Sequence, residues 1–154
     1  MIDREISMDR SELSALVRSQ KRALGLTWAQ ICSAMGVSRE WGTTALLGQM
    51  PLTPEQSSLA VQLLQLPPEA ENLLQEIPMR GGLPTAVPTD PTIYRFYEIL
   101  QVYGPTLKEL IHEEFGDGIM SAIDFTMELQ RVSDPQGDRI QVVLNGKYLQ
   151  YKRY

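Results

Sequence analysis

The sequence predicts a mainly α-helical protein with a small α+β part. Apolar residues recur at helical spacing through the first 77 residues, and apolar and polar residues alternate after residue 122. Between these regions, residues 79–88 contain two glycines and two prolines, which is typical of a linker. We therefore expect an N-terminal helical bundle with a helix-turn-helix-like core (residues 1–79). A C-terminal oligomerisation domain of helices and short strands should follow (residues 80–154).

The N-terminal half should contain four or five short helices. Ser and Thr side chains cap helix starts because their oxygens accept hydrogen bonds from the first unpaired amides, and glycine or proline commonly ends a helix. Helix starts are expected at Ser11, Thr27, Ser38, Thr53 and Pro68, with ends near Gly25, Gly36, Gly48, Leu66 and Ile77.

Residues 26–41 have the pattern of a helix-turn-helix, in which Gly36 makes the turn. Such a motif either binds DNA or serves as a compact helical scaffold. Its second helix offers one basic residue, Arg39, next to Glu40, and Gly42 weakens the helix. Neither half of the chain is basic, whereas DNA-binding proteins surround the reading helix with Lys and Arg. We therefore expect a scaffold and no nucleic-acid partner.

The C-terminal half should begin with a helix capped by Asp90. Its carboxylate can accept hydrogen bonds from the first amides, and Pro91 suits the first helical position, where its missing N–H costs nothing. The pattern predicts that this helix ends at Gly104 and that Pro105 starts a second helix, which runs to Phe115.

A glycine-rich segment, residues 115–121, follows the second helix and has two interpretations. Its glycines allow close backbone approach, so the segment could present amides and Ser121 to a small ligand. It could equally be a tight turn from helix to strand.

Three short strands are expected next, at residues 123–130, 140–144 and 147–151. Residues 134–137 should form one turn, and Asn145–Gly146 should form a hairpin-type turn. Two helices and three short strands make a thin core for a unit of this size. We therefore expect other subunits to complete this half.

The composition excludes several kinds of site. Cys32 is the only cysteine and His112 the only histidine, so we expect neither an intrachain disulfide nor a zinc site built on His or Cys. Cys32 should be a buried structural residue in a cytoplasmic protein. No apolar run approaches the ~20 residues of a membrane span, and residues 1–6 lack the features of a secretory signal.

The residues suited to chemistry are Arg95, Glu98 and Ser121. Ser121 lacks an evident base, because His112 lies on a glutamate-rich helix face. Arg95 offers a permanent charge and a planar set of donors for a small anion, and Glu98 lies beside it three residues on. Their spacing alone favours an ordinary surface ion pair instead. Arg80 could add a second anion contact, although a solvated linker residue is the simpler interpretation.

Three runs resemble the cyanase family (cyanate hydratase, also called cyanate lyase). They are residues 87–104 (VPTDPTIYRFYEILQVYG), residues 107–125 (LKELIHEEFGDGIMSAIDF) and residues 144–149 (LNGKYL). The N-terminal half resembles the family more loosely, at residues 27–35 and 44–49.

This resemblance implies a bicarbonate-dependent decomposition of cyanate. Bicarbonate would attack cyanate, and the resulting dianion would lose carbon dioxide to give carbamate, which breaks down to ammonia and carbon dioxide. The family's catalytic Arg, Glu and Ser fall on Arg95, Glu98 and Ser121. The resemblance further implies that no metal or organic cofactor is needed. It also implies a homodecamer, a pentamer of dimers with intertwined C-terminal halves and active sites between subunits.

Two alternatives belong to other functional classes. One is a transcriptional regulator that joins a helix-turn-helix to a ligand-sensing, oligomerising domain. The other is a purely structural oligomer. Bicarbonate-dependent release of ammonia from cyanate would distinguish the enzyme from both.

Overall fold

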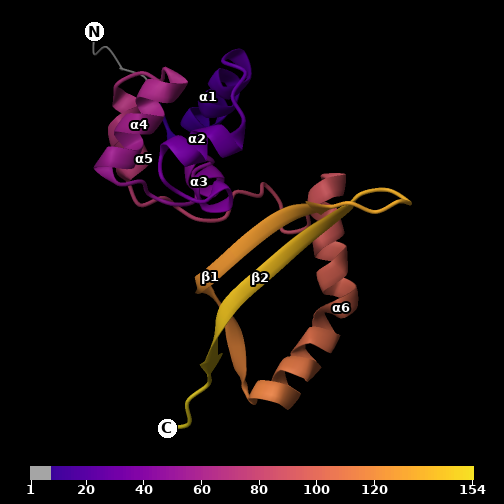
Figure 1. Ribbon diagram of the computed structural model, residues 1–154. Coiled ribbons are helices and arrows are strands. Elements are labelled where there is room, and N and C mark those ends of the chain that lie inside the picture. The colour runs from indigo at the N-terminus through magenta and orange to yellow at the C-terminus, as the bar shows by residue number, and fades with distance from the viewer. Residues whose placement is uncertain (1–7) are drawn as a thin grey trace. The chain divides into compact units, whose positions relative to one another are not determined.

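A computed structural model describes residues 8–154, which form two compact units. The first unit extends to Gly82 and the second begins at Leu83 (Figure 1). The expected boundary after residue 79 stays a prediction about which segments fold independently. The first six residues, on which the expected absence of a secretory signal rests, lie outside the described residues.

From residue 8 onward, the first unit, called the helical unit below, contains five helices. They are α1 (Arg10–Ala23), α2 (Trp28–Ala34), α3 (Arg39–Leu46), α4 (Pro54–Leu64) and α5 (Glu69–Gln75). The helix-turn-helix-like pair is α2 and α3, and Gly36 between them has φ 70°, which confirms the predicted turn.

Side-chain caps define most of the helix starts. Thr27, Ser38 and Thr53 cap α2, α3 and α4, as predicted. The prediction of Ser11 as the cap of α1 is wrong, because Asp9 takes this role. Its Oδ1 accepts from the Glu12 amide at 2.8 Å while the Glu12 carboxylate accepts from the Asp9 amide, also at 2.8 Å. This reciprocal pair satisfies two otherwise unpaired amides and starts the helix earlier.

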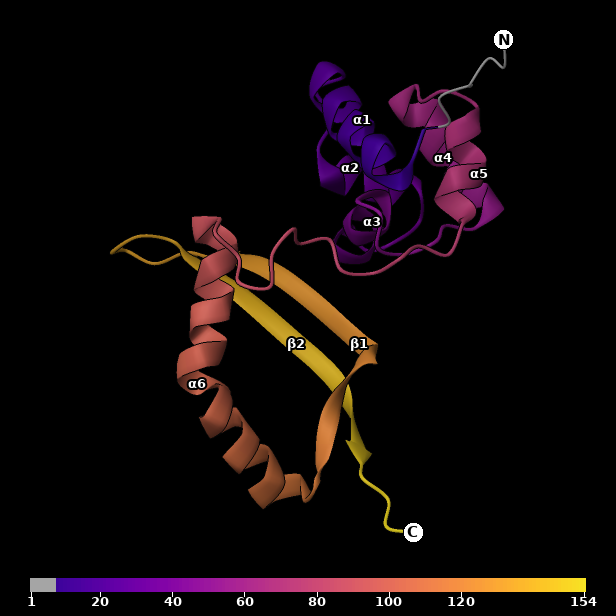
Figure 2. The ribbon, with the colours of Figure 1, turned by 180° about the vertical axis from the view of Figure 1, so that it is seen from behind.

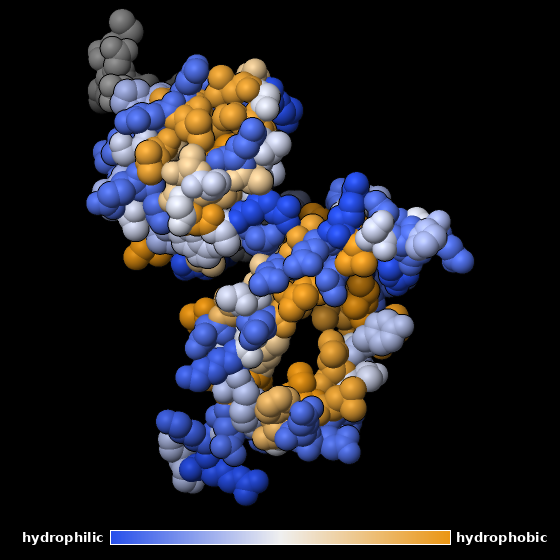
Figure 3. Space-filling view, viewed as in Figure 1, coloured by the Kyte–Doolittle hydropathy of each residue, from blue (hydrophilic) through white to orange (hydrophobic). Residues whose placement is uncertain are grey.

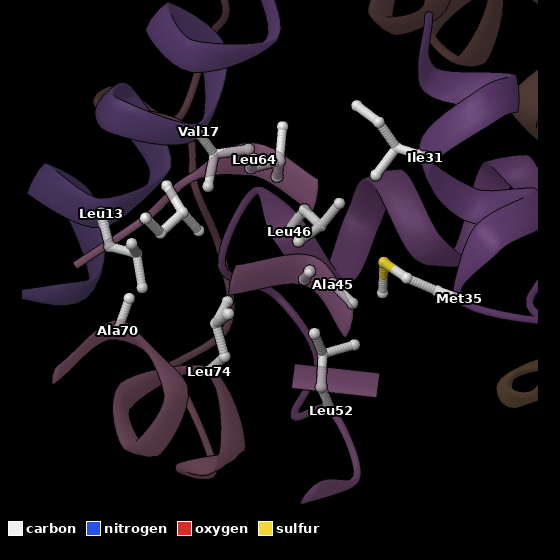
Figure 4. Close-up of a cluster of buried hydrophobic side chains, with 12 residues drawn as sticks. Leu13, Val17, Ile31, Met35, Ala45, Leu46, Leu52, Leu64, Ala70 and Leu74 are labelled. Atoms are coloured by element: carbon white, nitrogen blue, oxygen red, sulfur yellow. The ribbon is translucent and has the colours of Figure 1, made fainter. Parts of the chain in front are cut away.

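The helical unit encloses a continuous hydrophobic core to which all five helices contribute (Figure 4). Cys32 is 1% exposed, and its Sγ lies 3.5 Å from the Arg39 carbonyl oxygen, which confirms the predicted structural role. The buried hydrophobic residues are Leu13, Val17, Ile31, Cys32, Met35, Ala45, Leu46, Leu52, Ala60, Leu64, Leu66, Ala70 and Leu74.

Arg10 links three parts of the helical unit. Its guanidinium donates to the carbonyl oxygens of Leu73 (2.7 Å), Ala45 (3.1 Å) and Met50 (3.0 Å). The first two lie in the last turns of α5 and α3, beyond the regular helical hydrogen bonds, and the Ala45 carbonyl also accepts from the Gly48 amide at 3.0 Å. Burial lowers the pKa of the Arg10 guanidinium, and the charge of Glu76 partly opposes this effect.

The second unit, called the open unit below, contains one helix and a two-stranded antiparallel sheet. The elements are α6 (Pro91–Phe115), β1 (Gly118–Val132) and β2 (Arg139–Gln150). The predicted turn at residues 134–137 is confirmed, since the Gly137 amide donates to the Asp134 carbonyl at 3.0 Å. The expected turn at Asn145–Gly146 and the third strand are wrong, because both segments belong to β2.

The prediction that Gly104 and Pro105 separate two helices is also wrong. Both residues lie inside α6, which runs for 25 residues. Proline removes one backbone donor and bends a helix without necessarily ending it, and α6 is visibly bent (Figures 1 and 2).

The open unit leaves its apolar residues exposed. Neither α6, β1 nor β2 buries a hydrophobic side chain within the described chain. Figure 3 shows open space between α6 and the sheet, bordered by apolar residues. Exposed positions on α6 include Phe96 (46%), Leu100 (59%) and Leu110 (55%). None of the helices within residues 8–154 combines the length and the apolar composition needed to cross a membrane.

Candidate active site

The start of α6 is fixed by the predicted cap. Asp90 Oδ1 accepts from the amides of Thr92 and Ile93, both at 3.0 Å, and Pro91 occupies the first helical position. A preorganised first turn holds the side chains that follow in fixed directions. Arg95 and Glu98 are the charged residues of the next turn.

Arg95 and Glu98 form the ion pair that their spacing predicts. Arg95 Nη1 lies 2.8 Å from Glu98 Oε2, and the two side chains are 66% and 49% exposed in the single chain. The guanidinium carbon lies 5.8 Å from the centre of the Tyr94 ring, which in turn lies 5.9 Å from the Tyr97 ring. At this exposure the pair contributes little to stability, so its position beside two aromatic rings suits a contact surface better than a stabilising role.

Ser121 lies in β1, at an irregularity of the sheet. Met120 pairs with Tyr148 and Phe125 pairs with Gly146, so residues 121–124 lie opposite Lys147 alone. This is an enlarged β-bulge. Ser121 is 4% exposed, and its Oγ accepts from the amides of Ile123 and Asp124, both at 3.0 Å.

The glycine-rich segment before Ser121 forms the tight turn from helix to strand, and presentation of its groups to a ligand stays a prediction. Gly116 ends α6 with φ 96°, and β1 begins at Gly118. Ser121 therefore projects from a strand, three residues beyond the turn. Sequence reasoning missed the two amides that hold its hydroxyl, because every residue except proline carries a backbone donor and no residue type marks these two.

One chain brings together only part of the expected site. Arg95 and Glu98 are bonded to each other, and within residues 8–154 Ser121 is bonded to neither. A hollow at the end of the chain is lined by Asp117 and residues 150–154, and it contains none of the three. Arg80 is exposed and contacts Met50 Sδ at 3.8 Å, within the helical unit.

The described residues include no group of three or more His, Cys, Asp or Glu that could hold a metal ion. Burial raises the pKa of the Cys32 thiol, while a hydrogen bond with Thr43 opposes this effect. A protonated, buried thiol is unsuited to nucleophilic attack, which leaves Arg95, Glu98 and Ser121 as the candidate groups.

Both halves of the chain match families of known proteins. Residues 85–153 match the family described as "Cyanate lyase C-terminal domain", and residues 10–78 match "Cyanate hydratase, N-terminal". The chain belongs to the cyanate lyase family. The first match contains Arg95, Glu98 and Ser121, so all three candidate residues lie within the family's C-terminal domain.

Individual relatives of the cyanate lyase family cover almost the whole chain. A protein from Thiobacillus denitrificans named "Cyanate hydratase" is 56% identical over 147 residues, which is 96% of this chain and 100% of the relative. One of the same name from Dechloromonas aromatica is 57% identical with the same coverage. The crystal structure of cyanase from T. urticae has 36% identity and a TM-score of 0.75, covering 90% of this chain and 96% of that one.

Proposed function

We propose that this protein is a cyanate hydratase, a lyase that decomposes cyanate in a bicarbonate-dependent reaction. The observation that carries the proposal is the identity of more than half of all residues, along nearly the whole chain, with relatives that bear this name. The solitary Cys32 supports a cytoplasmic setting.

In this proposal Arg95 and Ser121 bind the two anions. Two unit charges 4 Å apart repel by about 4 kcal/mol at the effective dielectric constant of a protein surface, so cyanate and bicarbonate need fixed positive charge to meet. Arg95 supplies that charge in a chain whose net charge is −5. Ser121 supplies a hydroxyl donor, and this role needs no neighbouring base.

Glu98 orients Arg95 or handles a proton. Addition of bicarbonate to the cyanate carbon gives a dianion, which takes up one proton as it loses carbon dioxide and becomes carbamate. A second proton converts carbamate to ammonia and a second molecule of carbon dioxide. The ion pair at 2.8 Å supports the orienting role. In the other role, Glu98 in its carboxylic acid form would give the first proton to the reacting nitrogen and become a carboxylate. No metal or organic cofactor takes part in this scheme.

The active site forms between subunits of a homo-oligomer, which we propose is a decamer built as a pentamer of dimers. The exposed apolar residues of α6, β1 and β2 support assembly, because an uncovered apolar surface of this extent is costly in water. Assembly would also exclude water from this pair, which strengthens the attraction between Arg95 and anions. No nucleic acid or membrane takes part.

Ammonia release from cyanate tests the proposal. The purified protein should release ammonia from cyanate only when bicarbonate is added to a carbon-dioxide-free buffer. Arg95→Leu should reduce the rate to background, whereas Arg131→Leu should leave it unchanged. Arg131 is a matched control because it is also an exposed arginine that forms an ion pair. It lies in β1, and its Nε is 3.5 Å from Asp138 Oδ2. Turnover without bicarbonate, or none in a folded oligomer, would contradict the proposal.

A further inference from the structure

The bulge of β1 constrains what the Ser121 hydroxyl can do. A hydroxyl has two lone pairs and one proton. Both lone pairs of Ser121 Oγ are used by the amides of Ile123 and Asp124, at 3.0 Å each. Within residues 8–154 no hydrogen bond uses the proton. The hydroxyl is therefore held as an acceptor by the bulge and is left with one role, that of a donor.

The bulge packs against Gly146 of β2. A Cβ atom at this position would meet the Ser121 carbonyl oxygen and the Met120 side chain closer than real atoms approach. The backbone conformation of Gly146 is one that other residues also adopt, since its φ lies outside the left-handed region. The glycine is therefore needed for space. Only a residue without a side chain lets the carbonyl of Ser121 lie against β2.

We propose that Gly146 is a positioning residue for the cyanate reaction: it seats the bulge so that the Ile123 and Asp124 amides aim the Ser121 hydroxyl proton at a bound anion. This inference rests on the proposed function, and it adds residues of the same site. A fixed donor stabilises negative charge without reorganising during the reaction, which is the condition under which such a group is most effective.

A double-mutant cycle with Gly146→Ala and Ser121→Ala tests the inference. Loss of one hydrogen bond to a charged group corresponds to a decrease of about 10- to 100-fold in kcat/KM, so each single variant should show a decrease in this range. Because Gly146 acts through Ser121, the double variant should match Ser121→Ala within about twofold. A merely structural role for Gly146 would multiply the two losses instead.

Gly82→Ala is the matched control. Gly82 also lacks a left-handed φ, and a Cβ there would meet only the flexible end of the Gln49 side chain. Its kcat/KM should equal that of the wild type. Light scattering should give the same mass for all variants, and a Gly146→Ala protein with the wild-type mass and kcat/KM would overturn the inference.

Amide hydrogen exchange separates failure of this inference from failure of the proposed function. Exchange at Ile123 and Asp124 should accelerate about five- to tenfold in Gly146→Ala and in Ser121→Ala, and not in Gly82→Ala, because a hydrogen bond contributes about 1 kcal/mol. Unchanged exchange in Gly146→Ala would show that Gly146 does not hold the bulge of β1 in place, whatever the activity of the variant. If exchange accelerates in Gly146→Ala but the folded wild-type protein releases no ammonia from cyanate, the catalytic part of the inference and the proposed function are both overturned.

Discussion

The helical unit buries thirteen hydrophobic residues, whereas α6, β1 and β2 bury none within residues 8–154. Both regions contain many apolar residues, so composition does not explain the contrast. In the helical unit five short helices surround one another, and each covers its neighbours. In the open unit a long helix and a two-stranded sheet have too few faces to enclose a core. Apolar residues therefore serve folding in one unit and, in our proposal, association in the other.

A charge on the apolar surface of α6 should have the largest effect, because it should prevent association of the open unit. Leu100→Glu places a carboxylate on a position that we expect to be covered by another subunit, where an unpaired charge is strongly unfavourable. Light scattering should give a lower mass for the variant than for the assembled wild-type protein, and the activity of the variant should fall to background. Leu59→Glu on α4, where Leu59 is 44% exposed, should keep both, and an assembled Leu100→Glu protein would contradict the role given to α6.

Truncation of a core residue should destabilise the helical unit by itself. Leu64→Ala removes a fully buried side chain, and the expected loss in free energy of unfolding is about 3 kcal/mol. Denaturant titration at several protein concentrations measures it. The loss at Leu64 should not depend on concentration, whereas the effect of Leu107→Ala on α6 should, because association stabilises that unit by mass action. Equal concentration dependence in both variants would show that the two units do not fold separately.

Arg10→Met should weaken the helical unit to a smaller degree. The change keeps an unbranched apolar stem and removes the guanidinium with its three hydrogen bonds to the carbonyls of Leu73, Ala45 and Met50. The expected loss in free energy of unfolding is about 2 kcal/mol, since partly buried carbonyls lose their donors. Arg18→Met, at an exposed position of α1, should change it by less than about 0.5 kcal/mol. A similar loss in both variants would mean that the three bonds contribute nothing.

The smallest expected effect concerns pH. Burial raises the pKa of Cys32 in the folded state, so the unfolded chain gives up this proton first as the pH rises. The stability contribution is fully present below the ordinary thiol pKa of about 8.5 and decreases above it. Thermal unfolding between pH 7 and pH 10 should show this decrease in the wild type. Cys32→Ala, although less stable at pH 7, should show a shallower decrease, and parallel curves would contradict the assignment.

Local signals in the sequence predicted many features of the helical unit. Thr27, Ser38 and Thr53 cap helices because an N-cap depends on a side chain and amides two or three residues away. The prediction for the cap of α1 was wrong because Asp9 and Ser11, two residues apart, both carry side chains that can cap a helix, and Asp9 finds a reciprocal partner in Glu12. The turn at Gly36 and the burial of Cys32 followed from the same short-range pattern.

The open unit was harder to predict because its local signals conflict with its long-range pairing. Pro105 and Asn145–Gly146 are typical of breaks, yet α6 continues through one and β2 through the other. Gly146 pairs with Phe125 next to the bulge and lacks a side chain where the Ser121 carbonyl lies against it, and these contacts involve residues more than twenty positions away. The Arg95–Glu98 pair was predictable from spacing, whereas the catalytic roles of Arg95, Glu98 and Ser121 stay predictions.

The two-stranded sheet also has a consequence for synthesis of the protein. β1 and β2 each have one outer edge, 15 and 12 residues long, whose backbone groups are not paired by a third strand. On the ribosome the helical unit emerges first and can fold before the sheet, which in our proposal is covered only when other chains associate with it. During that interval the free edges can pair irregularly and aggregate. The yield of active protein then depends on the rate of correct assembly relative to the rate of aggregation. Slower translation, lower temperature or added chaperones should favour assembly.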